Sequence, residues 1–161
     1  MTEPSREPAG APSTGAAGDR AQGLARRSAA AMWREDAASK GLGMRLVEVA
    51  PGRAVVAMTV RPEMTNGHGI CHGGLIFTLA DSAFAFACNS HNRRTVAQGC
   101  DIVFVAPAES GQELTATALE RLRTGRNGIY DVTVRTPDRV VAEFRGRSRE
   151  IGGTVADEEL E

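Results

Sequence analysis

The chain has few of the features that mark a membrane, secreted or nucleic-acid-binding protein. None of its 161 residues belongs to an apolar run of the roughly 18 residues that a membrane-spanning helix needs. The net charge is −1, so the one-sided basic surface typical of nucleic-acid binding is not expected. The three cysteines are too few for a disulfide framework, and no signal-peptide core precedes them. We therefore expect a cytoplasmic protein that binds neither membrane nor nucleic acid.

The length fits a single domain with one core of ordinary size. Residues 1–22 are rich in alanine, glycine and proline, which predicts a disordered leader. Residues 153–161 are mostly polar and end in four acidic side chains among the last five, which predicts a flexible acidic tail. The folded domain is therefore expected over residues 23–152.

Hydrophobic periodicity predicts an α+β domain. Apolar residues recur at helical spacing over 23–43, where Gly41 is a stop signal, and almost all round the segment 74–89. Alternating segments bounded by turn residues predict strands at 44–49, 54–60, 95–108, 112–124, 128–136 and 139–151. A helix that is apolar on nearly every side is surrounded by protein. The order of elements therefore predicts a curved antiparallel sheet wrapped around one long central helix.

Asp81 is out of character with the apolar helix that contains it. An ionised carboxylate without partners in such a setting costs several kcal/mol, so proteins usually pair it or shift its pKa. Three interpretations are open: a wet stripe that Asp81 shares with Thr78, Ser82 and Asn89, an ion pair with an arginine of the strands, or a functional carboxylate.

The segment Cys71-His72-Gly73-Gly74 precedes this helix. Two glycines let a ligand approach the backbone closely, and free N–H groups at a helix start suit an oxyanion. Gly73 is the expected donor, and the alternative is a flexible lead-in to the helix.

The histidines and cysteines of this region also raise the question of a metal. His68, Cys71 and His72 are followed by Cys88 and His91, but the spacing matches none of the usual zinc pairs. Cys88 also falls on the apolar helix face, where a small thiol is ordinary packing. We therefore predict no metal site, and the chain has no G-x-S-x-G elbow of a serine hydrolase either.

Three segments together resemble a known family. NGHGICHGGLIFTLADSAFAFACNS, GIYDVTV and AEFRGRSREIGGT are similar to the hotdog-fold thioesterases of the phenylacetic-acid degradation (PaaI) type, and the similarity runs from about Met32 to Thr154. The resemblance implies a long helix wrapped in an antiparallel sheet, and protomers that join their sheets edge to edge. It also implies hydrolysis of acyl-CoA thioesters without metal or organic cofactor, by a homo-oligomer that is at least a dimer and is expected to be a tetramer of two dimers.

The resemblance also assigns residues. Carried over by position, Asp81 is the catalytic carboxylate, the Gly73 amide polarises the thioester carbonyl, and Asn66 and His72 line the site. The predicted substrate or CoA contacts are Gly74, Glu35, Gln98, Arg126, Asn127 and Arg145. Two of these depart from the family pattern, because Glu35 stands where close relatives carry asparagine and Gln98 where relatives often carry a small hydroxyl residue. For the arginines, which suit CoA phosphates, an ordinary solvated sheet surface is the alternative.

Helix geometry adds an argument that is independent of the family. Gly73 and Asp81 are eight positions apart, which is about 12 Å along a helix, whereas an oxyanion donor and an attacking group must both lie about 3 Å from one carbonyl. One chain cannot supply both groups, so the active unit is expected to be at least a dimer. Asp81 acts either as a nucleophile or as a general base on water.

These observations favour a thioesterase for aryl-acetyl-CoA, in particular (hydroxy)phenylacetyl-CoA. The alternatives are a hotdog enoyl-CoA hydratase and a non-enzymatic acyl-CoA sensor, although the chain offers no DNA-reading module for a transcriptional sensor.

Overall fold

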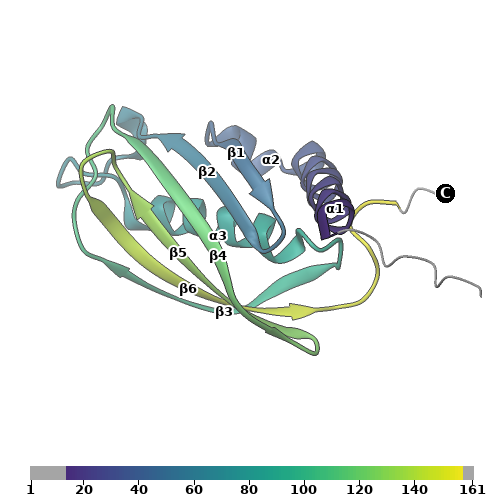
Figure 1. Cartoon of the computed structure of the whole chain (residues 1–161). Coiled ribbons are helices and arrows are strands. Elements are labelled where there is room, and N and C mark those ends of the chain that lie inside the picture. The colour runs from purple at the N-terminus through teal and green to yellow at the C-terminus, as the bar shows by residue number, and fades with distance from the viewer. Residues whose placement is uncertain (1–13, 158–161) are drawn as a thin grey trace, which may run out of the picture.

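The computed structural model of the protein describes residues 14–157 and is shown in Figure 1. Its helical elements are α1 (Thr14–Glu35), α2 (Ala37–Gly41), the short 3-10 helix η1 (Pro62–Met64) and α3 (Gly73–Asn89). Its strands are β1 (Arg45–Ala50), β2 (Arg53–Thr59), β3 (Thr95–Phe104), β4 (Glu113–Thr124), β5 (Asn127–Arg135) and β6 (Val140–Glu150). Within these residues no helix is both long and apolar enough to cross a membrane.

The strands form one antiparallel sheet that curves around α3 (Figure 1). The strand order is β1-β2-β4-β5-β6-β3. Hairpins join β1 to β2 and link β4, β5 and β6, whereas β3 follows α3 and pairs with the far side of β6. The strands β1 and β3 are therefore the two edges of the sheet. The predicted α+β hotdog architecture is confirmed.

The core lies between α3 and the inner face of the sheet. Phe84 of α3 is buried against Tyr130 and Phe144, with ring centroids 5.5 and 5.9 Å away. The sheet makes room for this ring at Gly146, where an added β-carbon would lie 2.8 Å from three carbons of Phe84. Since real carbon contacts are not that short, a glycine in β6 is what lets α3 lie so close to the sheet.

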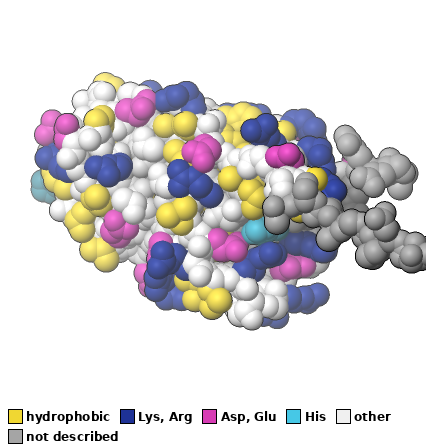
Figure 2. Space-filling model, viewed as in Figure 1, with side chains coloured by type: hydrophobic (Ala, Val, Ile, Leu, Met, Phe, Trp, Pro, Cys, Tyr) yellow, Lys and Arg dark blue, Asp and Glu magenta, His cyan; other side chains and the backbone are white. Residues whose placement is uncertain are grey.

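The outer face of the sheet is polar and charged. Figure 2 shows positive, negative and hydrophobic side chains interspersed over the face in view. Cross-strand pairs account for several of these charges: Arg145 binds Asp131 through two bonds of 2.7 and 2.9 Å, and Arg147 lies 2.7 Å from Asp101. Such alternation of inner apolar and outer polar residues fits a sheet with one face on the core.

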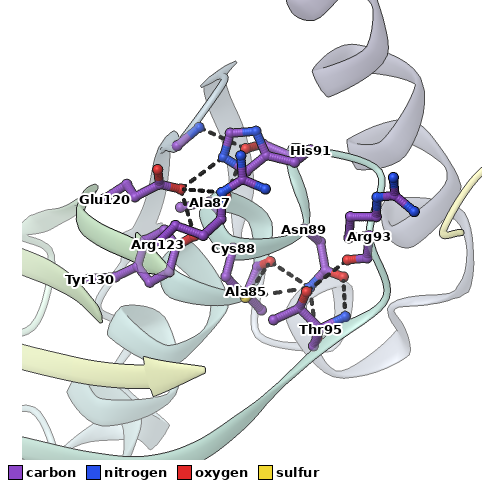
Figure 3. Close-up of polar contacts among 12 residues, drawn as sticks. Ala85, Ala87, Cys88, Asn89, His91, Arg93, Thr95, Glu120, Arg123 and Tyr130 are labelled. Carbon is purple, nitrogen blue, oxygen red and sulfur yellow. Dashed lines mark hydrogen bonds and ion pairs between the residues drawn. The ribbon is translucent and has the colours of Figure 1, made fainter. Parts of the chain in front are cut away.

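A polar cluster fixes the C-terminal end of α3 to the sheet (Figure 3). The Tyr130 hydroxyl donates to Glu120 Oε2 at 2.7 Å, and His91 Nε2, just beyond α3, lies 2.8 Å from the same oxygen. The Asn89 side chain donates to the Thr95 carbonyl and accepts from the Thr95 amide, at 2.9 and 3.0 Å. These contacts set where β3 begins relative to α3.

The environment of Glu120 holds its carboxyl group in the ionised form. Burial on its own would raise the pKa of Glu120. The hydrogen bonds from Tyr130 and His91, with the nearby charges of His91 and Arg123, outweigh burial and leave the pKa below its ordinary value.

Two predicted boundaries are wrong. Helix α1 begins at Thr14, so residues 14–22 are helical and do not belong to a disordered leader. Alanine favours helix, and the Gln22 side chain donates to the Val49 carbonyl of β1 at 2.7 Å. The first helix also stops at Glu35, because Asp36 caps a separate helix by accepting from the Ser39 amide at 2.9 Å.

The start of the predicted flexible tail is attached to the domain. Asn92 Oδ1 accepts from the amides of Val155 and Ala156 at 3.1 and 2.8 Å, and the Gly153 carbonyl accepts from the Arg94 amide at 3.0 Å. Asn92 is buried and has a positive φ of 55°, a conformation that asparagine tolerates better than most residues. The remaining leader and tail predictions, on residues 1–13 and 158–161, lie outside the described residues.

The cluster around Glu120 makes stability depend on pH. Glu120→Gln removes the charge that Tyr130 and His91 contact, so the free energy of unfolding should fall by about 1 to 3 kcal/mol at pH 7. The folded-state pKa lies below the ordinary value of 4.5, so the contribution is complete above about pH 4.5 and is lost as the pH falls through the folded-state pKa. Urea denaturation at several pH values should show the difference shrinking in acid. The exposed Glu109→Gln is the control, and a difference independent of pH would contradict this account.

Candidate active site

His72 caps the N-terminus of α3 and leaves one amide free. The His72 Nδ1 atom accepts a hydrogen bond from the Gly74 amide at 2.9 Å, which places the ring proton on Nε2. The carbonyl of His72 accepts from the Leu75 amide at 2.9 Å. None of the described residues accepts a hydrogen bond from the Gly73 amide. The two glycines are the first residues of the helix, and Gly73 N–H points out of a positive helix end.

A groove of about 480 Å³ opens beside Gly73. It is lined by Asn66, Ile70, Cys71, Gly73, Ile76, Phe104, Val105, Ala106 and Pro107. Asn66 forms a tight turn there, because its amide donates to the Ile70 carbonyl at 2.8 Å and its Oδ1 accepts from the His68 amide at 2.9 Å. The side-chain NH₂ of Asn66 has no acceptor among the described residues. The structure therefore brings two predicted site residues, Asn66 and Gly73, to one apolar groove with N–H donors.

Asp81 is half-buried in the middle of α3. Burial raises the pKa of its carboxyl group. No arginine or lysine of the described residues forms an ion pair with it. The ion-pair interpretation is therefore excluded for a single protomer, and Asn89, a member of the proposed wet stripe, is buried and bonded to Thr95. Thr78 and Ser82 are half-buried like Asp81, so two interpretations remain: a wet stripe of these three residues, and a functional carboxylate.

Gly73 and Asp81 lie on one continuous helix beside the same edge strand. An added β-carbon at Gly73 would lie 3.1 Å from Phe104 at the end of β3. Further along β3, burial and then the charge of Asp81 raise the pKa of Cys100. The four-residue step from Cys100 to Phe104 spans about 13 Å of strand, which matches the roughly 12 Å of helix between Asp81 and Gly73. Both groups therefore lie near β3, at separate positions along it.

The other predicted contacts lie elsewhere in the protomer. Glu35 is exposed at the end of α1, 3.3 Å from Arg34, and Gln98 is exposed where the pairing of β3 with β6 is irregular. Arg126 and Asn127 lie at the β4–β5 turn, near the opposite end of α3 from Gly73. Arg145 is held by Asp131 on the outer face of the sheet. None of these residues lines the Gly73 groove.

The sequence did not identify Phe104 as a site residue. Strand periodicity does not show which face of β3 meets α3, and that face is what places the ring against Gly73. Among residues 14–157, no three His, Cys, Asp or Glu side chains lie close enough together to hold a metal ion.

Because Asp81 is partly buried, removing its charge is expected to increase the stability of the folded protein. The ordinary pKa is 3.8 and the folded-state pKa is higher, so ionisation disfavours the folded state as the pH rises from about 3.8 through the folded-state pKa. Asp81→Asn should therefore raise Tm at pH 7, and the gain should vanish below about pH 3.8. Thermal denaturation with the exposed Asp138→Asn as control measures this, and a lower Tm for Asp81→Asn would refute it.

Comparison with known proteins places the chain in a family. Residues 68–143 match the thioesterase superfamily. The acyl-coenzyme A thioesterase PaaI of Escherichia coli is 47% identical over 133 residues, which are 82% of this chain and 95% of that protein. The solved structure of E. coli PaaI superposes with a TM-score of 0.81 at 46% identity, covering 83% of this chain and 97% of that one. A mutant of the phenylacetic acid degradation protein PaaI from Thermus thermophilus gives 0.68 at 36% identity, covering 70% and 97%. The chain therefore belongs to the thioesterase superfamily, and within it to the hotdog-fold acyl-CoA thioesterases of the PaaI type.

Proposed function

We propose that this protein hydrolyses aryl-acetyl-CoA thioesters, with (hydroxy)phenylacetyl-CoA as the main substrates, to the free acid and CoA. The observation that carries the proposal is the free Gly73 amide at the start of α3, in an apolar groove beside Asn66. The acyl-CoA thioesterase activity of the PaaI type follows from the 47% identity to the E. coli enzyme. The preference for aryl-acetyl groups goes beyond this activity and is the part that we propose.

The Gly73 amide binds the thioester carbonyl oxygen in this mechanism. As negative charge develops on that oxygen, the N–H group and the positive end of α3 stabilise it, and one such donor contributes about 3 to 4 kcal/mol to catalysis. The free NH₂ of Asn66 is placed to be a second donor. His72 is a positioning residue, because its ring occupies the Gly74 amide and fixes the first turn of the helix.

The attacking group is the partner's Asp81. The β3 edge is unpaired in the protomer and exposes Val103, so two copies can pair their β3 strands antiparallel about a two-fold axis. A pairing centred between Cys100 and Phe104 sets Phe104 opposite the partner's Cys100. Because Phe104 marks the position of Gly73 and Cys100 that of Asp81, the same symmetry brings Gly73 toward the partner's Asp81.

Asp81 then opens the thioester in one of two ways. As a nucleophile it forms a mixed anhydride with the acyl group and releases the CoA thiolate, and water hydrolyses the anhydride. As a general base it takes a proton from water, whose oxygen attacks the carbonyl; the C–S bond then breaks, and the departing CoA sulfur takes up the proton from Asp81. Both routes use the same carboxylate, and because burial raises its pKa, it is a stronger base than an exposed aspartate.

The β4–β5 turn is the proposed site for CoA phosphates. Arg126 is exposed there beside Asn127 and has no acidic partner among the described residues. In the two-fold dimer this end of α3 lies toward the partner's Gly73. Arg145 belongs to the same proposal, although Asp131 already occupies its guanidinium. Glu35 and Gln98 stay predictions as acyl-side contacts that a neighbouring protomer would complete. The assembly proposed is a cytoplasmic tetramer of two dimers.

A thiol-release assay over aryl and aliphatic acyl-CoAs tests the function. The wild-type protein should release CoA fastest from phenylacetyl-CoA and its hydroxylated forms, and Asp81→Asn should abolish turnover. Gly73→Pro deletes the donor N–H at a helix position where proline is tolerated, since His72 already has an extended backbone with ψ 130°.

Gly73→Ala is the matched control, because it adds a β-carbon but keeps the N–H. We expect kcat of Gly73→Pro to lie about 10²- to 10³-fold below that of Gly73→Ala. No thiol release from any thioester, or full turnover by Asp81→Asn, would refute the proposed function.

A further inference from the structure

The groove beside Gly73 has an aromatic wall. Phe104 closes β3, and about half of its surface is exposed. Its ring points its far end at Gly73, since an added β-carbon would lie 3.1 Å from Cζ and 3.4 Å from both Cε atoms. A large apolar ring thus lies against the residue whose amide is free, at the mouth of a groove of about 480 Å³.

Contact with a bound thioester follows from this geometry. A carbonyl oxygen that accepts from the Gly73 N–H lies about 3 Å from the nitrogen, which is bonded to the α-carbon. The Phe104 ring occupies the space next to that carbon, where a β-carbon would be. The two substituents of the carbonyl carbon, the acyl group and the sulfur, therefore reach the groove within van der Waals distance of its walls.

The lining of the groove selects the acyl group over the CoA arm. None of the described residues that line it carries a charge, and its other lining residues include Ile70, Ile76 and Val105. The pantetheine arm carries two amides and leads to phosphates, which need polar and cationic partners. An aryl ring needs only apolar walls, and an aromatic partner adds about 0.5 to 1.5 kcal/mol beyond burial.

We infer that Phe104 determines the acyl-group specificity of the enzyme: its ring is the wall on which an aryl acyl group packs while Gly73 holds the carbonyl. The inference rests on the proposed thioesterase function. Phe104 takes no part in proton transfer or attack. Because it also lies in the proposed β3 pairing, its role in specificity is read from the ratio of two thioesters, which a general loss of activity or of dimer leaves unchanged.

The test compares two thioesters with eight acyl carbons, phenylacetyl-CoA and octanoyl-CoA. Phe104→Leu keeps an apolar side chain but removes the ring, and Phe104→Ala removes both. Each should lower the ratio of kcat/KM for phenylacetyl-CoA to that for octanoyl-CoA by about twofold to tenfold, the loss of one aromatic contact. Phe104→Tyr keeps the ring and should keep the ratio. Leu119→Ala removes another exposed apolar side chain, on β4, and should leave the ratio unchanged.

The outcomes separate this inference from the proposed function. If the wild-type protein hydrolyses both thioesters and the two Phe104 variants slow both equally, Phe104 is not a specificity residue, although the thioesterase stands. If the wild-type protein hydrolyses neither thioester, the proposed function and the role of Phe104 fail together. Size-exclusion chromatography and Tm of each variant show that the fold is kept, and Phe104→Leu decides the matter if Phe104→Ala does not fold.

Discussion

A continuous helix holds apart the two groups that we propose to act on the thioester. Gly73 begins α3 and Asp81 lies eight positions later, so the hydrogen-bonded backbone fixes about 12 Å between them. No side-chain movement closes such a gap. In the proposed mechanism the two groups therefore come from two chains. Strand β3 offers the pairing surface for this, because its outer edge is unpaired in the protomer.

The rest of the fold serves to place that helix. Phe84 sits over Gly146, which has no side chain to displace it. Glu120 binds Tyr130 and His91 at the far end of α3, and His72 caps the near end. The helix is thereby fixed at both ends and packed along its length. Asp81 is the exception, because it is a half-buried carboxylate without an ion-pair partner among the described residues. A residue that costs stability in this way is common at functional sites.

Much of the fold and the place of the candidate site could be predicted from the sequence, because they depend on local pattern. The sequence alone shows an apolar helix at 74–89, the aspartate within it and the glycines before it. The observed α3 begins one residue earlier, at Gly73. What could not be predicted depends on contacts between distant residues. The pairing of Arg145 with Asp131 follows from strand register, Asn92 holds the start of the tail across 63 positions, and Phe104 meets Gly73 only once β3 crosses to the sheet edge. The early start of α1 was hidden by an alanine- and glycine-rich composition that also suits a linker.

We propose that each active site combines Gly73 of one protomer with the partner's Asp81, and a hybrid oligomer can show whether it does. Asp81→Asn and Gly73→Pro subunits, each inactive in its own homodimer, are co-expressed with different affinity tags, and the mixed dimers are isolated by tandem purification. If sites form between chains, each hybrid dimer contains one site with both groups intact, and it should recover about half of the wild-type turnover. If Gly73 and Asp81 of the same chain acted together, no intact site would exist, and a hybrid as inactive as its parents would contradict the account.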